Sequence, residues 1–246
     1  MALDIALMIV SILIFFVGIF SLVISIWLAV KYVKYNRRQN SAGLSGMDVA
    51  RRILDSNGLS HIEVKRTGSL FFGNSYSHHF KKVRLRSFIR HETSLTSIGI
   101  GAQKAALAIL DKEGDADMKK RIRMIPMMAF GPFAFIPLIA AGVALDYYVF
   151  NGNSVTCTIV FGSLGILFYG YSIILSLLTL KTEKKAQNKA YDILKCDYKI
   201  TEDELSALKE LFRLYNIQYV NDIILSSLEV LYIALKIASA VKGDSN

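Results

Sequence analysis

Histidines near a possible strand are the first residues of this sequence that could do chemistry, because imidazole is the commonest protein ligand for zinc. His78 and His79 are adjacent, and His91 follows nearby. On a strand, the two adjacent side chains would point to opposite faces and could not easily share one ion. His91 could approach Glu183, but one imidazole and one carboxylate make a weak site. These residues therefore offer at most a rebuilt metal site that uses His91, His78 or His79 with Glu183.

Three further ionisable residues fall inside apolar stretches, where a charge is costly and needs a partner or a function. Asp146 and Lys236 lie at similar predicted depths in a membrane, which predicts an ion pair between them. Glu229 could accept hydrogen bonds from polar side chains of the preceding stretch, namely Tyr169, Tyr171 and Ser172. We expect these charges to join helices within a bundle, and an ion pathway is the alternative.

The elements that must position these residues are mostly membrane helices. The chain is 53% hydrophobic, which exceeds the usual range for soluble domains. About 20 helical residues cross the hydrocarbon core of a bilayer. Four stretches are long enough, at about 5–30, 125–150, 156–180 and 223–241. The sequence therefore predicts a mainly α integral membrane protein with four transmembrane helices, in a single membrane domain covering residues 1–246.

The distribution of basic residues predicts the orientation of these helices. Of the 29 Lys and Arg, 19 lie between Lys31 and Arg123 and eight more between Lys181 and Arg213. By the positive-inside rule, residues 31–124 and 181–222 are cytoplasmic. Both termini of a multi-pass protein of the cell membrane would then lie outside. The basic face would attract anionic headgroups of the lipid bilayer, whereas no recognition motif supports nucleic-acid binding.

The cytoplasmic segments carry local folding signals. Ser45 and Asp48 can cap a helix from residue 46 to about 57, which Gly58 would end. Thr201 and Glu204 form a capping-box pattern that opens another helix, to about residue 221. Between these helices we expect strands at 61–66 and 80–85, a turn at 73–75, and a helix at about 94–111.

Two of these segments match a known pattern. Residues 94–110 read SLTSIGIGAQKAALAIL and residues 41–59 read SAGLSGMDVARRILDSNGL. They resemble segments of the YugP-like neutral zinc metallopeptidase family, whose members typically carry SLAALGVAAHEAGHAIQ and GLTGAEVARRILDANGL there. The resemblance extends over nearly the whole chain. It implies a zincin-like helical and β element on the cytoplasmic side, and peptide hydrolysis with zinc as the family activity.

The resemblance also shows which reactive groups this chain lacks. The two histidines and the glutamate of the family's HExxH motif fall on Gln103, Leu107 and Lys104, and the expected third ligand falls on Glu183. An amide is a poor zinc ligand, an alkyl group is none, and an ammonium cannot act as a carboxylate base. We therefore predict no catalytic residue and no metal or other cofactor. A Lys104–Glu183 salt bridge would take the place of zinc.

Three functions follow from these patterns. The first is a catalytically inactive homologue of a membrane zinc metallopeptidase, acting as a binding, regulatory or scaffold subunit. Its partner would be an active metallopeptidase paralogue or a second copy of the chain. The second is an active peptidase that holds zinc in the rebuilt site. The third is a small transporter or channel that uses Glu229, Asp146 and Lys236.

Overall fold

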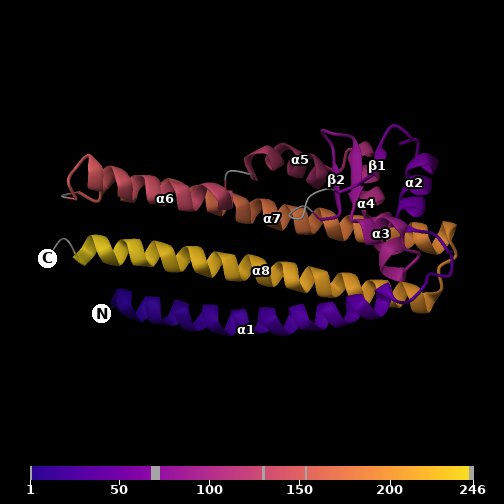
Figure 1. Ribbon diagram of the computed structural model, residues 1–246, viewed down its shortest axis with the longest axis horizontal. Coiled ribbons are helices and arrows are strands. Elements are labelled where there is room, and N and C mark those ends of the chain that lie inside the picture. Colours follow the sequence, from indigo (N-terminus) through magenta and orange to yellow (C-terminus); the bar gives the residue numbers. More distant parts are fainter. Residues whose placement is uncertain (1, 68–72, 129–130, 153, 244–246) are drawn as a thin grey trace. The chain divides into compact units, whose positions relative to one another are not determined.

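The structure is a computed structural model that describes residues 2–67, 73–128, 131–152 and 154–243 (Figure 1). Most of these residues are helical, which confirms the predicted mainly α class. The chain divides into two compact units. Unit 1 comprises Met1–Val23, Arg123–Leu178 and Gln218–Asn246, and unit 2 comprises Ile24–Ile122 and Thr179–Ile217.

Two helices are long and apolar enough to cross a membrane. They are α1 (Ala2–Asn36) and α7 (Thr156–Asp197). The apolar part of α1 is largely exposed, with Phe15 and Phe16 both more than 60% accessible. A core helix would bury these rings, so their exposure fits contact with lipid. Two of the four predicted spans thus meet the length and hydropathy criterion.

The other two predicted spans are not confirmed. Residues 125–150 include the end of α5 (Ala116–Met128) and the shorter α6 (Gly131–Tyr148), which contains Pro137. The fourth stretch is the second half of α8 (Glu202–Gly243), a continuous helix that begins at the predicted capping box. Within the described residues, neither α6 nor α8 meets the length and hydropathy criterion.

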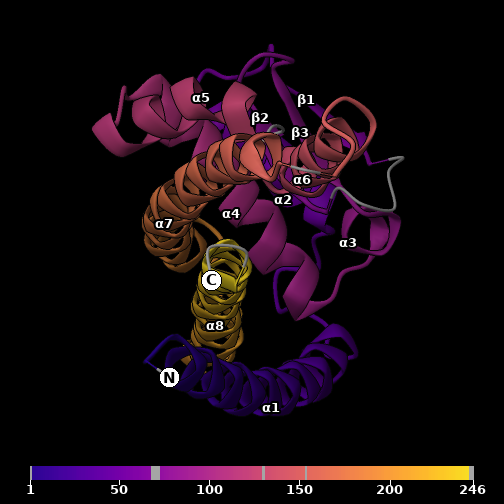
Figure 2. The ribbon, with the colours of Figure 1, turned by 90° about the vertical axis from the view of Figure 1, so that its left-hand side faces the viewer.

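Unit 1 is built from close helix contacts. Gly142 of α6 lies so near the start of α7 that an added Cβ would come within 2.8 Å of Cys157 O. The Phe135 and Tyr169 rings meet edge to face, with centroids 5.6 Å apart. The first half of α1 and the second half of α8 lie side by side in both views (Figures 1 and 2). A hydrogen bond of 3.2 Å from Gln218 Nε2 to Ser21 Oγ joins these two helices.

Unit 2 is organised around α4 (Leu95–Lys112), whose residues from Leu95 to Leu110 are all buried. Ser94 caps this helix by accepting a hydrogen bond from the Ser97 N–H. Against it packs α2 (Gly46–Ser56), which buries the apolar side chains Val49, Ala50, Ile53 and Leu54. The predicted Ser45–Asp48 capping box is present, and Gly58 follows with a φ of +64°. The short helix α3 (Ser87–His91) was not predicted.

A three-stranded sheet completes unit 2. Strand β3 (Lys82–Leu85) is central, parallel to β1 (Glu63–Arg66) and antiparallel to β2 (Ser75–Ser77). Strands β1 and β3 lie inside the predicted segments. Strand β2 was missed, because residues 73–75 were interpreted as a turn and Ser75 in fact begins β2.

Candidate functional site

The candidate site is built on the middle of α4 and on the charged half of α7, which follows its apolar residues 156–180. Helix α4 carries Gln103 and Lys104 on one turn and Leu107 on the next. Leu107 is fully buried in the core of unit 2, and Gln103 and Lys104 are 6% and 9% exposed. A helix buried on all sides must satisfy each polar side chain internally.

Glu183 of α7 satisfies both polar side chains. Its Oε2 accepts hydrogen bonds from Lys104 Nζ at 2.8 Å and from Gln103 Nε2 at 2.9 Å. Its Oε1 lies 3.4 Å from Arg121 Nη2 of α5, and Arg121 also donates to Thr182 at 3.1 Å. One carboxylate thus joins three helices. The structure brings together Lys104 and Glu183, as the salt-bridge hypothesis requires.

The charges in this cluster favour an ionised Glu183. Burial by itself would raise the pKa of its carboxyl, but the Lys104 ammonium and the Arg121 guanidinium outweigh this effect. The pKa is therefore lowered from its ordinary value, and the group is a carboxylate near neutral pH. The two cations face one anion, so this buried cluster has no excess of negative charge that would attract a further cation.

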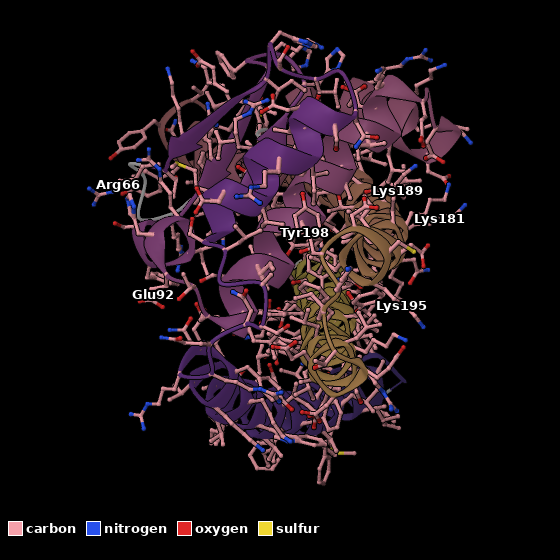
Figure 3. The ribbon with its side chains drawn as sticks, turned by 90° about the vertical axis from the view of Figure 1, so that its right-hand side faces the viewer. Arg66, Glu92, Lys181, Lys189, Lys195 and Tyr198 are labelled. Atoms are coloured by element: carbon pink, nitrogen blue, oxygen red, sulfur yellow. The ribbon has the colours of Figure 1, made fainter. Side chains whose placement is uncertain are left out.

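A second ion-pair cluster lies beside the first. Lys185 Nζ is 2.6 Å from both Asp115 Oδ2 and Asp117 Oδ2, and Lys181 Nζ is 3.0 Å from Asp117. Hydrogen bonds from Lys185 and Lys181 lower the pKa of Asp117. Farther along α7, Lys189 pairs with Glu113, and Lys195 pairs with Glu202 at 2.7 Å. Figure 3 shows Lys181, Lys189 and Lys195 along this helix. These pairs hold the charged half of α7 against its neighbours.

Comparison with known proteins identifies the family of this chain. A family model described as "Putative neutral zinc metallopeptidase" matches residues 9–238. The chain belongs to this family. It is also 26% identical over 221 residues to the "Putative membrane protease YugP" of Bacillus subtilis (strain 168), covering 88% of this chain and 92% of that protein. No solved structure matches the chain.

The zinc that the family name implies can be tested against these residues. Structural and catalytic zinc sites use imidazole, thiolate or carboxylate ligands, usually with a position left for water. The positions that the resemblance assigns to the two histidine ligands hold an amide and a buried alkyl group, and the single carboxylate is held by Lys104 and Arg121. The positive charges occupy the place where a dication would need negative ligands. This donor set does not fit zinc.

In the described residues, the histidines have neighbours other than Glu183. His78 and His79 follow β2 in a turn rather than on a strand, and their rings meet edge to face with centroids 5.5 Å apart. His78 Nδ1 lies 2.6 Å from Asp111, and His91 is exposed at the end of α3. Within the described ranges, no hydrogen bond or ion pair connects these histidines to Glu183. The same part of the chain holds no group of three or more His, Cys, Asp or Glu side chains suited to a metal.

The charges within the apolar stretches also find other neighbours. Asp146 accepts backbone N–H hydrogen bonds from Cys157 and Thr158, at 2.9 and 2.8 Å. Lys236 Nζ instead lies 5.2 Å from the centre of the Tyr232 ring. The predicted Asp146–Lys236 pair was therefore wrong: the exposed N–H groups at the start of α7 provide closer donors for this carboxylate.

Glu229 differs from expectation as well. This side chain is exposed and, with Ser11, Ile14, Tyr232 and Ile233, lines a hollow of about 470 Å³ between α1 and α8. No hydrogen bond joins it to Tyr169, Tyr171 or Ser172 in the described part of the chain. Its surroundings are provided by α1, rather than by the polar side chains of α7.

Arg121 is the site residue that sequence reasoning missed. The sequence analysis counted it only among the basic residues between Lys31 and Arg123 that predict the orientation. Its side chain is 13% exposed and faces Glu183, whereas Lys119 and Arg123 are exposed. A helical periodicity was the available signal, because Met118, Arg121 and Ile122 share the inner face of α5.

Proposed function

We propose that this chain is a catalytically inactive member of its metallopeptidase family and acts in the membrane as a binding or regulatory subunit. The observation that carries the proposal is the contact of Glu183 with both Lys104 and Arg121. The carboxylate that could serve as a metal ligand instead forms ion pairs with two basic side chains. The helix that would supply two imidazoles supplies Gln103 and Leu107 instead.

The family scaffold around these positions supports a role in binding. The core of unit 2 remains closely packed around α4, and the polar side chains at the former site have found new partners. A chain that keeps the framework and replaces its reactive groups can still recognise a related surface. The proposed partner is an active membrane metallopeptidase of the same family, and a second copy of this chain is the alternative partner.

Metal analysis of the purified full-length protein tests the proposal. We expect zinc well below one ion per chain by mass spectrometry, and no cleavage of a fluorogenic peptide library. The matched variant Gln103→His/Lys104→Glu/Leu107→His restores the motif, and we expect its zinc content to rise because Glu183 can then act as the third ligand. Stoichiometric zinc in the unaltered protein, with peptide cleavage that a chelator stops, would refute the proposal.

The rebuilt-site alternative is distinguished by two further variants. If His78 or His91 held a catalytic zinc, replacing either by Asn would remove both metal and activity. We expect neither replacement to change the zinc content. Co-purification from native membranes then tests the partner, which we expect to be a relative that carries an intact HExxH helix.

The transporter hypothesis keeps one supporting observation, the exposed Glu229 beside Ser11 in the hollow between α1 and α8. An ionisable group within an apolar helix is a functional candidate by default. Ion flux into proteoliposomes that Glu229→Gln abolishes would favour this hypothesis, and unchanged flux would remove its support.

A further inference from the structure

A pocket of about 200 Å³ lies within unit 2, outside the cluster around Glu183. Three segments line it: the chain after α2, strand β2 with its following turn, and the end of α4. Its lining residues are Leu59, His61, Ile62, Tyr76, His78, Lys81, Ala108, Asp111 and Lys112. The volume suits a small ligand, and none of the lining residues belongs to the cluster around Glu183.

The polar lining is dominated by groups that carry or can gain a positive charge. Two ammonium groups, Lys81 and Lys112, and two imidazoles, His61 and His78, face a single carboxylate, Asp111. Lys112 donates one hydrogen bond to the carbonyl oxygen of Asn57 at 2.6 Å and retains two further N–H donors. Apolar side chains form the rest of the wall. This composition favours an anion.

Asp111 organises the pocket. Its Oδ2 accepts hydrogen bonds from the Tyr76 hydroxyl and from His78 Nδ1, both at 2.6 Å, and its side chain is 11% exposed. The contact to Nδ1 leaves Nε2 of His78 for a ligand. Burial, together with the Asp111 carboxylate, raises the pKa of Tyr76, so the phenol keeps its proton. The histidine is thus held in one orientation.

The turn after β2 places the ammonium of Lys81 next to this histidine. Lys81 has a φ of +48°, and its Nζ lies 3.5 Å from His78 Nδ1. Because Asp111 contacts Nδ1, an anion in the pocket could accept hydrogen bonds from His78 Nε2 and from the Lys81 ammonium.

We propose that this pocket binds a phosphate group with a free P–OH, either inorganic phosphate or a phosphomonoester. Lysine and histidine donors bind the unprotonated phosphate oxygens, and the Asp111 carboxylate accepts the remaining P–OH proton. Sulfate has no such proton near neutral pH, so the carboxylate repels it. The pocket therefore discriminates between two anions of similar size and shape. This inference does not depend on the proposed function, because no residue of the Glu183 cluster takes part.

Calorimetric titration of the full-length protein in detergent tests the proposal with sodium phosphate and sodium sulfate at equal ionic strength. We expect saturable phosphate binding and at least tenfold weaker sulfate binding. His78→Asn and Lys81→Asn should each weaken phosphate binding at least tenfold, and asparagine tolerates the left-handed backbone at position 81. His79→Asn is the matched control, because His79 does not line the pocket, and it should bind normally.

Asp111→Asn tests the discrimination itself. The amide carries no charge, so the preference for phosphate over sulfate should shrink, while thermal unfolding reports whether the variant is folded. The proposal is overturned if the unaltered protein shows no saturable phosphate binding, binds sulfate equally well, or responds identically to His78→Asn and His79→Asn. Dihexanoyl phosphatidic acid distinguishes the sources: binding much tighter than that of inorganic phosphate assigns the pocket to a lipid headgroup, and similar or weaker binding assigns it to the free ion.

Discussion

At the scale of single residues, the chemistry of this chain depends on one carboxylate. Glu183 accepts hydrogen bonds from Lys104, Gln103 and Arg121 within the interior of unit 2. The Lys104 contact could be predicted, because the resemblance put this cation at the helix position that once faced the metal ligand. The Arg121 contact could not be predicted, because it depends on the direction that the chain takes between α4 and α5.

Glu183→Gln should lower the free energy of unfolding by about 2–3 kcal/mol, because it leaves two cations partly buried without a counter-charge. Glu113→Gln is the matched control. Glu113 pairs with Lys189, but its side chain is 51% exposed, and loss of such a surface pair costs less than about 1 kcal/mol. Denaturant unfolding in detergent measures both variants. Equal losses would show that the Glu183 cluster contributes no more than a surface ion pair.

Reversing both charges of the Lys104–Glu183 pair should restore only part of the stability that each single reversal removes. Lys104→Glu and Glu183→Lys should each destabilise the protein, and combining them restores the pair. The recovery should be partial, since Arg121 would then lie beside a lysine instead of a carboxylate.

At the scale of elements, α2 and α4 pack with their backbones in close contact. An added Cβ at Gly101 would lie 2.3 Å from Gly46 O, and one at Gly46 would lie 2.8 Å from Ser97 O of α4. Small residues at both positions allow this approach, which lets α4 sit at the centre of unit 2. At this interface glycine is needed because a larger side chain would collide with the neighbouring backbone, and not because the backbone has a positive φ.

Gly101→Ala should therefore destabilise unit 2 by about 1–3 kcal/mol or more, the usual cost of overpacking a core. Gly73→Ala provides the control, since no heavy atom lies within 4 Å of its added Cβ. Thermal unfolding followed by circular dichroism compares the two variants. An unchanged melting temperature for Gly101→Ala would contradict the close helix contact.

The elements that the sequence could predict are those with local signals. Both capping boxes mark their helix starts, and the positive φ of Gly58 ends α2 where expected. Strand β2 has three residues, and it is defined by pairing with β3 rather than by its own pattern. Its misassignment also misplaced His78, whose true partner Asp111 is 33 residues away. Contacts across such separations leave no mark in a single sequence.

At the scale of the whole molecule, the two units differ in character. Unit 1 contains the apolar parts of α1 and α7, and unit 2 contains the sheet, the buried helix α4 and the charged half of α7. The two units do not define which side of the membrane each loop occupies, and this orientation is predicted only from the distribution of Lys and Arg. Multi-pass topology with both termini outside remains a prediction.

The two cysteines test this topology. Both thiols are free, with Cys157 at the start of α7 and Cys196 exposed near its end. A membrane-impermeant maleimide applied to intact cells should label Cys157 and spare Cys196, and permeabilised cells should show both labelled. Cys157→Ser and Cys196→Ser assign each signal. Labelling of Cys196 in intact cells would invert the orientation.

The contact between Asp146 and the first N–H groups of α7 has a consequence for how the protein enters a membrane. The Asp146 carboxylate can accept hydrogen bonds from Cys157 N and Thr158 N only after α6 has packed against the beginning of α7. If α6 crosses the membrane, as the sequence predicts, this helix released alone from the translocation machinery would expose a bare anion to lipid. We therefore expect the two helices to leave that machinery as a finished hairpin, with the turn between them formed before either helix meets acyl chains.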